Sequence, residues 1–539
     1  MSTARRAGRG KGHTMVAAVA VIAAACAVLA VPAPVGAESA GATTRAIGTS
    51  ARLSLGSVFA CAVLDSGQVT CWGRGQYGRL GNGSEATIGD DDTLRDGTPV
   101  TMPGGARAVA VTSGFAHACA LLDTGDVTCW GLNNLGQLGR GDGTWIGDDE
   151  TITAGGTTVA FPGGQKAVAI AAGEGHTCAV LADGAVSCWG YGGYGSLGYG
   201  NTNSIGDDES VASAGTVALP GGQGAVAITA GIFSTCAILE SGDVACWGSS
   251  TYAGQLGYGS NTIIIGDNET PAQNALHGGL VPLPGGASAV AIASGDIHTC
   301  VILDNDGVSC WGFANGGQLG YGNTNNIGDN ETPAANPVNS GLVPLPGGQT
   351  PVSITGGSAH TCVTFASGAL SCWGAGNYGE LGYANTGWYG DDDVVTAAPN
   401  GGLVQLPGGQ SAVTVAAGEE STCAVLRDGG ITCWGRAGEG RLGYGNLDNI
   451  GDDETPAANP VNGALVPLPG SLSVSSVSGG YWHTCAVLAD GRVTCWGESP
   501  DGELGYGNTN TIGDNELLTA NPVNSGIVPL PGGQTATAR

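Results

Sequence analysis

One spacing recurs eight times along this chain: a cysteine is followed ten positions later by Cys-Trp-Gly. Successive copies start 58 to 64 residues apart, and their first cysteines are Cys61, Cys119, Cys178, Cys236, Cys300, Cys362, Cys423 and Cys485. A long repeat of this kind indicates a propeller or a solenoid, in which each unit packs on its neighbours. A chain of 539 residues can therefore form one repeated structure instead of several unrelated domains.

The segment between the two cysteines of a copy has the pattern of a tight β-hairpin. In the third copy, Cys178-Ala-Val-Leu181 is followed by a turn that ends in Gly184 and then by Ala185-Val-Ser-Cys188. If Leu181 pairs with Ala185, the two cysteines face each other at a non-hydrogen-bonded position, where Cα atoms are about 4.5 Å apart. Each unit is therefore expected to carry its own disulfide.

The cysteine count agrees with this expectation, because the chain has 17 cysteines and Cys26 alone lies outside the repeats. Zinc binding is the alternative, but it needs four ligands, and each unit supplies two cysteines and at most one nearby histidine. In the fifth unit Asp306 takes the place of the turn glycine, and aspartate tolerates a positive φ better than most residues. The predicted pairs are Cys61–Cys71, Cys119–Cys129, Cys178–Cys188, Cys236–Cys246, Cys300–Cys310, Cys362–Cys372, Cys423–Cys433 and Cys485–Cys495.

The first 37 residues have the features of an export signal. A basic start at residues 5–11 precedes an apolar run at residues 15–31, and small residues precede Glu38. We expect cleavage after Ala37, a linker at residues 38–50, repeats at residues 51–539 and a secreted or cell-surface location. The alternative is a lipoprotein with its lipid on Cys26, although the residue three places before that cysteine does not fit the usual motif.

Charge restricts the partners of the chain. The net charge is −28, and without residues 1–37 it becomes −32, because 13 basic residues remain against 45 acidic ones. Such a surface repels phosphate backbones and anionic lipids, so no nucleic-acid partner is expected. After the signal no apolar run reaches the length that spans a membrane, so no membrane span is expected. The expected partner is a protein or another extracellular macromolecule with a cationic patch.

Within a unit, the pattern predicts four short strands and one long connection. Alternating small apolar residues such as those at 167–173 come first, the hairpin follows, and a glycine-rich stretch, an acidic loop and a proline-rich segment complete the unit. Four strands per unit without helical periodicity are typical of a blade of a β-propeller. The later units contain a few more residues than the first three, so one sector of the ring should have longer loops.

The segments Trp130-Gly-Leu-Asn-Asn-Leu-Gly-Gln-Leu-Gly139 and Gly173-Glu-Gly-His176 resemble the regulator of chromosome condensation repeat family, and the resemblance extends over residues 51–539. The resemblance implies an all-β fold, a single β-propeller of four-stranded blades. Eight units predict eight blades; the alternative is seven, the number in the founding members, with one displaced unit. A similar propeller serves a secreted bacterial inhibitor of β-lactamases, so binding a protein through propeller loops has a precedent among similar proteins.

Three sets of residues repeat with the units and are interpreted first as structural. The histidines of Gly-x-x-His should satisfy a backbone group of the adjoining turn, and the eight tryptophans should act as wedges between blades, with carbohydrate stacking as the alternative. Aspartates of the acidic loops should close turns, although oxygen ligands in glycine-rich loops also suit Ca²⁺. The histidines are His117, His176, His298, His360 and His483, and the calcium candidates are Asp90, Asp148, Asp207, Asp267, Asp329, Asp391, Asp452 and Asp514.

The sequence contains none of the motifs Gly-x-Ser-x-Gly, His-Glu-x-x-His or the phosphate-binding loop, and after the signal it has a single lysine, Lys166. We therefore expect no catalytic residue and no cofactor other than calcium. The predicted function is a secreted, non-catalytic propeller that binds a macromolecule through its loops. The alternatives are guanine-nucleotide exchange, as the family resemblance implies, inhibition of a secreted enzyme, and a loop-borne carbohydrate-active enzyme.

Overall fold

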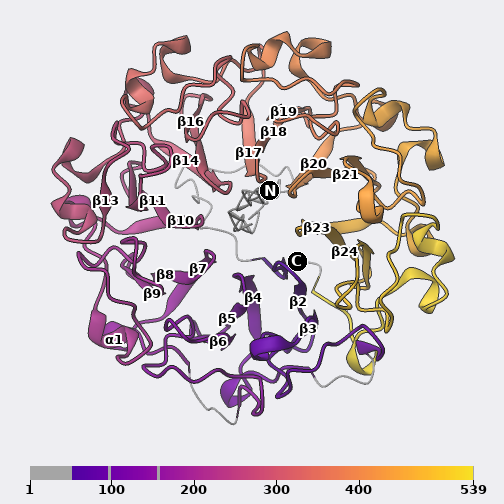
Figure 1. Cartoon of the computed structure of the whole chain (residues 1–539), viewed down its shortest axis with the longest axis horizontal. Coiled ribbons are helices and arrows are strands. Elements are labelled where there is room, and N and C mark those ends of the chain that lie inside the picture. Colours follow the sequence, from indigo (N-terminus) through magenta and orange to yellow (C-terminus); the bar gives the residue numbers. More distant parts are fainter. Residues whose placement is uncertain (1–50, 95–98, 154–157, 538–539) are drawn as a thin grey trace, which may run out of the picture.

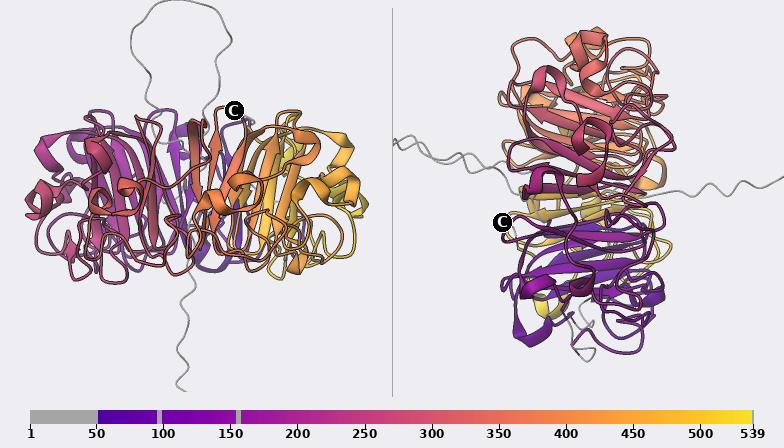
Figure 2. Two further views of the ribbon diagram at one scale, coloured as in Figure 1. Left: turned by 90° about the horizontal axis from the view of Figure 1, so that it is seen from above. Right: turned by 90° about the vertical axis from the view of Figure 1, so that its left-hand side faces the viewer.

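The computed structural model describes residues 51–94, 99–153 and 158–537. They form eight antiparallel sheets, of which seven have three strands and one has four. The sheets are arranged as blades around a common axis and follow each other in chain order (Figure 1). Seen from the side, the ring is a flat disc (Figure 2). The predicted all-β propeller with eight blades is thus confirmed.

Each blade begins at the centre of the ring and runs outward. The innermost strands are β1 (Leu53–Leu55), β4 (Ala108–Ser113), β7 (Ala167–Ala172), β10 (Ala225–Ala230), β14 (Ala289–Ser294), β17 (Pro351–Gly356), β20 (Ala412–Ala417) and β23 (Val474–Gly479). The second strands are β2 (Phe59–Val63), β5 (His117–Leu122), β8 (His176–Leu181), β11 (Ser234–Leu239), β15 (His298–Leu303), β18 (His360–Phe365), β21 (Ser421–Leu426) and β24 (His483–Leu488). The third are β3 (Val69–Gly73), β6 (Val127–Gly131), β9 (Val186–Gly190), β12 (Val244–Ser249), β16 (Val308–Gly312), β19 (Leu370–Gly374), β22 (Ile431–Gly435) and β25 (Val493–Gly497).

The hairpin between the second and third strands has the predicted register. Leu181 donates its N–H to the carbonyl of Ala185, and Gly184 closes the turn with a φ of 84°. The glycine is needed here because an L side chain rarely adopts that conformation. In the fifth blade Asp306 takes this place with a φ of 64°, as predicted.

The same register brings the cysteines together in every blade. Cys178 lies opposite Cys188 with a Cα–Cα distance of 4.1 Å, and the other seven predicted pairs are bonded at the same separation. Each of the eight disulfides therefore lies inside its own blade, and none of them joins two blades.

The fourth strand is much shorter than expected. Within residues 51–94, 99–153 and 158–537, only the fourth blade has a regular one, β13 (Ile264–Ile265), and in the others it is reduced to single bridges such as Gly190 with Ile205. Nearer the start of the third strand, Val217 donates its N–H to the carbonyl of Val186. The edge of β9 is therefore paired at both ends by two separate segments of the same long connection.

A tyrosine hydroxyl fills the gap between these two segments. Tyr199 accepts a hydrogen bond from the N–H of Cys188 at 3.0 Å and lies 3.0 Å from its carbonyl oxygen. A continuous fourth strand is not needed here, because the side chain satisfies the backbone groups that the strand would have paired. Equivalent tyrosines bond the third-strand cysteine in five further blades: Tyr258, Tyr321, Tyr383, Tyr444 and Tyr506.

Tryptophan joins each blade to the one before it. Trp189, which is fully buried, donates its Nε1–H to the carbonyl of Gln137 in the preceding blade at 2.9 Å. All eight tryptophans of Cys-Trp-Gly make this contact, at 2.7 to 3.1 Å, so the predicted wedge role is confirmed. Because the rings are buried, stacking on a carbohydrate is excluded for them.

The first blade is built from both ends of the described chain. Its innermost strand consists of β1, which pairs with β2, and of residues 535–537, which continue along the same edge. Asp65 donates its N–H to the carbonyl of Thr535, and Thr537 donates to that of Val63. Trp72 closes the ring by donating to the carbonyl of Glu503 in the eighth blade.

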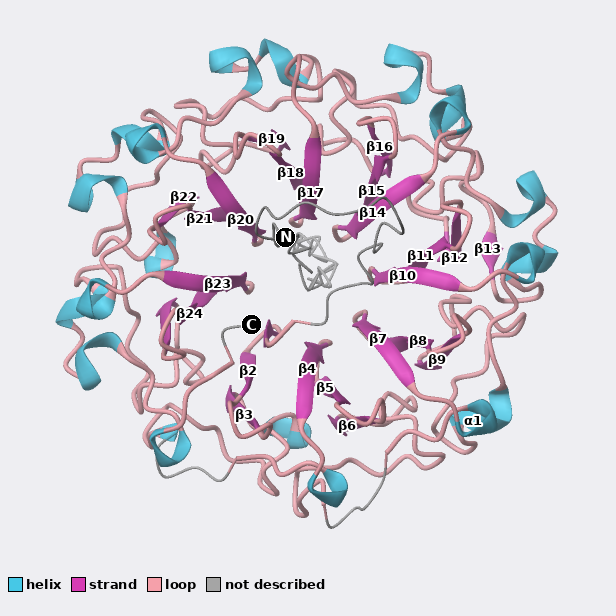
Figure 3. Cartoon of the chain, turned by 180° about the vertical axis from the view of Figure 1, so that it is seen from behind, coloured by secondary structure: helices cyan, strands magenta, loops and turns pink. Residues whose placement is uncertain are grey.

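Short helices lie around the outer part of the ring (Figure 3). One α-helix, α1 (Val211–Ala214), lies in the third blade. Single 3₁₀ turns precede most inner strands: η3 (Pro103–Gly105), η4 (Pro162–Gly164), η5 (Pro220–Gly222), η8 (Pro284–Gly286), η13 (Pro407–Gly409), η17 (Pro469–Ser471) and η20 (Pro531–Gly533). The longer connections of blades four to eight contain η6 (Pro271–Gln273), η7 (Leu276–Gly279), η9 (Pro333–Ala335), η10 (Val338–Gly341), η11 (Val395–Ala397), η12 (Pro399–Gly402), η15 (Pro456–Ala458), η16 (Val461–Ala464), η18 (Leu518–Ala520) and η19 (Asn524–Gly526). Two more, η1 (Gln76–Gly78) and η14 (Gly438–Gly440), follow third strands.

The predicted signal at residues 1–37, the linker at 38–50 and Cys26 lie outside the described residues. Within the described part of the chain, no helix is long and apolar enough to cross a membrane.

Candidate functional site

Two sets of loops meet on one face of the disc. The strands of a blade are antiparallel, so the loop between its first and second strands lies at the same end as the segment that leaves its third strand. A backbone hydrogen bond joins the two in every blade, for example from the N–H of Tyr191 to the carbonyl of Gly175 at 2.9 Å. We call this the variable face and define it by the first-loop residues 57–58, 115–116, 174–175, 232–233, 296–297, 358–359, 419–420 and 481–482, with the segments bonded to them.

Sequence varies at these first loops while their frame stays constant. A glycine precedes each pair, and a buried histidine, phenylalanine or serine follows it. The pairs themselves are Ser-Val, Phe-Ala, Glu-Gly, Ile-Phe, Asp-Ile, Ser-Ala, Glu-Glu and Tyr-Trp, all different. One scaffold thus presents eight chemically distinct loops on a single face.

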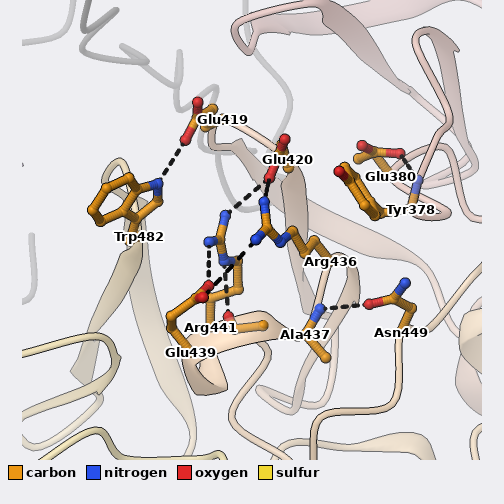
Figure 4. Close-up of polar contacts among 11 residues, drawn as sticks. Tyr378, Glu380, Glu419, Glu420, Arg436, Ala437, Glu439, Arg441, Asn449 and Trp482 are labelled. Atoms are coloured by element: carbon orange, nitrogen blue, oxygen red, sulfur yellow. Dashed lines mark hydrogen bonds and ion pairs between the residues drawn. The ribbon is translucent and has the colours of Figure 1, made fainter. Parts of the chain in front are cut away.

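A charged cluster occupies this face at the seventh blade (Figure 4). Glu420 accepts hydrogen bonds from Arg436 at 2.7 Å and from Arg441 at 3.4 Å. Arg441 also bonds Glu439 at 2.7 Å, and its side chain is only 2% exposed. We call these four residues the glutamate–arginine cluster. Its guanidinium groups already have carboxylate partners, so the cluster is a rigid, paired part of the face.

Beside the cluster lies a more accessible group. Trp482, which is 44% exposed, donates its Nε1–H to Glu419 at 3.0 Å. Burial raises the pKa of Glu419, and hydrogen bonds from Tyr481 and Trp482 oppose that rise. The indole and its carboxylate partner offer a partner molecule an aromatic surface next to an acceptor.

Two further carboxyl groups are buried below the face. Glu380 accepts from the N–H of Tyr378, and Glu503 accepts from that of Asp501, both at 2.9 Å. Burial is the main reason that the pKa of each rises to about 7. Three other blades place glutamine at the same position, where it makes the same contact with the backbone: Gln137, Gln255 and Gln318. Glu380 and Glu503 thus take the place of a structural amide.

Four of the five histidines bond the next blade instead of the adjoining turn, so the partner predicted for them was wrong. In these four, Nε2 lies 2.9 Å from a threonine hydroxyl, and the pairs are His117–Thr177, His176–Thr235, His298–Thr361 and His360–Thr422. Thr361 in turn donates to the carbonyl of Gln318 at 3.0 Å, so its oxygen accepts from His298. These histidines are interblade links.

Burial also keeps these histidines neutral. Their rings are almost inaccessible, and desolvation lowers the pKa to about 3 in His117 and His298 and to about 4 in His176, His360 and His483. A general acid or base at neutral pH needs a pKa near the working pH and contact with a substrate. The repeated histidines meet neither requirement.

His483 is the exception among the five. It faces the first blade, where Ala60 stands at the position that threonine occupies elsewhere. Among the described residues, no group bonds its buried Nε2. At the next junction, between blades one and two, Phe59 takes the histidine position and faces Ala118, so two apolar residues meet there.

The acidic loops lie between blades. The carbonyl of Gly147 accepts from the N–H groups of Gly83 and Ser84 in the preceding blade, and Asp207 accepts from the N–H of the next residue. These contacts agree with the predicted role in turns. In the loop at 148–150, burial and the neighbouring carboxylates raise the pKa of Glu150 to about 7.

Calcium at these loops stays a prediction. In each of four loops, three carboxylate groups place oxygen atoms within 4.8 Å of one another. These loops are at residues 90–92, 148–150, 207–209 and 452–454. Oxygen atoms of Asp148, Asp267, Asp329 and Asp391 are buried without a hydrogen-bond partner among the described residues. Such oxygens suit a hard cation in chemistry and spacing. Asp90, Asp452 and Asp514 instead accept from the next N–H in the chain.

Family models match most of the chain. A model described as an RCC1-like domain matches residues 143–528. Two models described as the regulator of chromosome condensation (RCC1) repeat match residues 51–79, 108–137 and 66–121.

Individual proteins are also similar. The ultraviolet-B receptor UVR8 of Arabidopsis thaliana is 28% identical over 433 residues, which are 80% of this chain and 87% of the receptor. The E3 ubiquitin-protein ligase HERC2 of Homo sapiens is 28% identical over 399 residues, which are 74% of this chain but only 7% of the ligase. The similarity therefore leaves most of that ligase without a counterpart here.

Two solved structures share the fold. Yeast RCC1 (Prp20), in a crystal structure with Kap60, matches with a TM-score of 0.55 and 18% identity over 84% of this chain and 94% of that one. Human WBSCR16 matches with a TM-score of 0.51 and 20% identity over 70% and 88%.

Proposed function

Because this chain belongs to the family of RCC1-like domain proteins, we propose that it is an exported, non-catalytic β-propeller that binds a protein partner through its variable face. The observation that carries the proposal is the contrast between eight unlike first loops and the constant frame beneath them. A scaffold that repeats its core while varying one face can recognise a large surface, since loops on a rigid frame commonly carry binding.

Three features support this function. Trp482 presents an exposed indole beside Glu419, and aromatic anchors of this kind dominate protein interfaces. The charge of −28 favours a partner with a basic surface, which it would also attract over a distance. Sixteen cysteines, all paired within hairpins, suit an oxidising compartment. The solved complex of yeast RCC1 with Kap60 gives a protein-binding precedent for a similar propeller.

Two measurements test the proposal. The full chain should be expressed in its native host, and the mature protein should appear outside the cytoplasm with Glu38 at its N-terminus. Partners captured from the extracellular fraction by the native protein should be lost or weakened with Trp482→Ala. Val413→Ala is the matched control, because Val413 is 52% exposed and lies at the start of β20, at the opposite end of the strand from the first loop. Equal capture by both variants, or retention in the cytosol with free thiols, would contradict the proposal.

Guanine-nucleotide exchange is the second function within the range of the family. It is tested by mixing the purified propeller with a Ran-type GTPase that carries fluorescent GDP. We expect no acceleration of nucleotide release, and a clear acceleration would replace the binding proposal by an exchange function.

A further inference from the structure

A pocket opens on the variable face across blades two to four. Its volume is about 320 Å³, and the residues that matter for its chemistry are Phe115, Glu174, Tyr191, Tyr194, Ile232 and Phe233. Phe115 comes from the second blade, Glu174 and the tyrosines from the third, and Phe233 from the fourth. The pocket therefore depends on three adjacent blades.

Aromatic rings form a continuous wall on one side. Tyr191 contacts Tyr194 edge-on at a centroid distance of 5.8 Å, Tyr194 lies 4.5 Å from Phe233, and Phe233 stacks on Tyr252 at 6.1 Å. Phe115 adds a ring that is 40% exposed. Ring faces of this kind attract cations through their quadrupoles.

One carboxylate lines this pocket. Glu174 is half-buried, and desolvation raises its pKa. Among the described residues, no cation or hydrogen-bond donor contacts its carboxylate. The loops that surround the pocket, at residues 114–117, 132–137, 173–176, 191–196 and 231–234, contain neither lysine nor arginine. A charge in such a place is stabilised by an opposite charge that arrives from outside.

Other blades show how the same face satisfies such positions internally. Tyr194 is the fourth residue after a third strand, and Tyr77 and Tyr378 are its equivalents in blades one and six. Arg79 lies over the ring of Tyr77 at 5.4 Å, and Arg436 lies over that of Tyr378 at 5.2 Å. Arg436 also binds Glu420, a glutamate in the first loop of its own blade, the seventh, which follows the blade of Tyr378 (Figure 4). At blade three Tyr194 and Glu174 both line the pocket, although here the glutamate comes from the first loop of the tyrosine's own blade, and no guanidinium of the described residues lies over the tyrosine.

We infer that this pocket binds an arginine or lysine side chain presented by the partner protein. The inference rests on the proposed function, because it identifies the chemistry that one part of the variable face recognises. The cationic head meets Glu174, and its methylene stem packs against Phe115, Tyr194 and Phe233. The incoming group combines an aromatic ring with a carboxylate, as Arg436 does within the chain.

The inference is tested with small probes on the full-length protein. The peptide acetyl-Gly-Arg-Gly-amide should bind, as measured by calorimetry or by NMR shifts of aromatic resonances, whereas the same peptide with neutral citrulline should bind at least tenfold more weakly. Free arginine is a third probe, which separates a side chain held by a polypeptide from a free amino acid. Tighter binding of the peptide supports the inference, and tighter binding of free arginine would overturn the assignment to a partner protein.

Two variants locate the binding. Glu174→Gln removes the charge and keeps the shape, and about a tenfold loss of peptide affinity is expected. Asp183→Asn is the matched control, because it removes one exposed carboxylate in the turn between β8 and β9, at the opposite end of the same blade, and should leave affinity unchanged. Equal affinity of both variants would overturn the pocket assignment. If Trp482→Ala still abolishes partner capture in that case, the proposed function stands without this pocket.

Discussion

The junction between the eighth and first blades should become more stable when threonine replaces Ala60. At other junctions a threonine accepts from the histidine Nε2 at 2.9 Å and donates to a carbonyl at about 3.0 Å, as Thr361 does between His298 and Gln318. The carbonyl at the closing junction belongs to Glu503, and Trp72 already donates to it. The equivalent carbonyl of Gln318 accepts from both a threonine and a tryptophan, so this oxygen can take the second bond.

The size of the effect follows from these contacts. A hydrogen bond contributes about 1 kcal/mol net, and a buried polar atom without a partner costs about 1–3 kcal/mol. Ala60→Thr should therefore raise the free energy of unfolding by roughly 1–3 kcal/mol. Its dependence on His483 gives a sharper test than the gain itself.

The effect of His483→Phe on the free energy of unfolding should differ in sign between the native chain and the Ala60→Thr variant. In the native chain, His483→Phe recreates the apolar pair that Phe59 and Ala118 make at the next junction, so stability should stay equal or rise. In the Ala60→Thr background, the same change breaks the new bond and should destabilise the protein. Together the four proteins should show a coupling energy of about 2 kcal/mol or more, as expected for residues in contact.

Urea unfolding followed by tryptophan fluorescence measures this cycle, with disulfides kept oxidised. His176→Phe is the control at a junction that already has threonine, Thr235, and it should destabilise the native chain. A coupling energy within about 0.5 kcal/mol of zero, the level at which independent sites add, would refute the interpretation of the His–Thr link.

Three further predictions concern charge and covalent links. Burial raises the pKa of Glu380 in the folded protein to about 7, so the folded state retains a proton that the unfolded chain releases. Ionising Glu380 therefore lowers the free energy of unfolding; this loss is absent below about pH 4 and complete above pH 7. Glu380→Gln should therefore raise the free energy of unfolding, measured with urea, by roughly 3 kcal/mol at pH 8 but leave it unchanged at pH 4; an equal gain at both pH values would contradict the raised pKa of Glu380. If the acidic loops bind calcium, Ca²⁺ should raise the melting temperature and EDTA should lower it, and an unchanged midpoint would remove calcium from consideration. Alkylation under native conditions should label no repeat cysteine, because all are buried in disulfides, and mass spectrometry finding 16 free thiols in the exported protein would refute the pairing.

Much of the fold could be predicted because the decisive contacts are local. The turn at Gly184 fixes the register of its hairpin, and the register alone places Cys178 opposite Cys188. The same logic held at Asp306, where the residue differs but the backbone conformation does not. Because the hairpin pattern recurs eight times in the sequence, one correct prediction applied to all eight blades.

Contacts between blades were harder to predict, because they join residues about one repeat apart. The partner of His176 was expected in its own turn but lies in the next blade, at Thr235. A signal was present in the sequence: threonine follows the histidine position in most units, and the exceptions are Ala60 and Ala118. The fourth strand was overestimated because the role of Tyr199 as a substitute for backbone pairing depends on where a long loop folds back.

The variable face was the least predictable part. The Gly-x-x-His pattern and its variants locate the first loops, but the two residues between differ from blade to blade, so no motif indicates what the loops bind. Glu174 and Glu420 differ in role only because of their surroundings. Arg436 pairs with Glu420, whereas the loops around the pocket at Glu174 contain no lysine or arginine.

The confinement of every disulfide to one hairpin has a mechanical consequence. Each bridge spans ten residues within a blade, so no covalent link resists separation of one blade from the next. A chain pulled from its two ends would extend blade by blade, while the loop inside each hairpin would stay hidden from the force. Reducing the bridges would release about 30 Å of additional contour length per blade. Resistance to pulling would therefore depend on tryptophan and histidine contacts, and only the final extended length on the redox state.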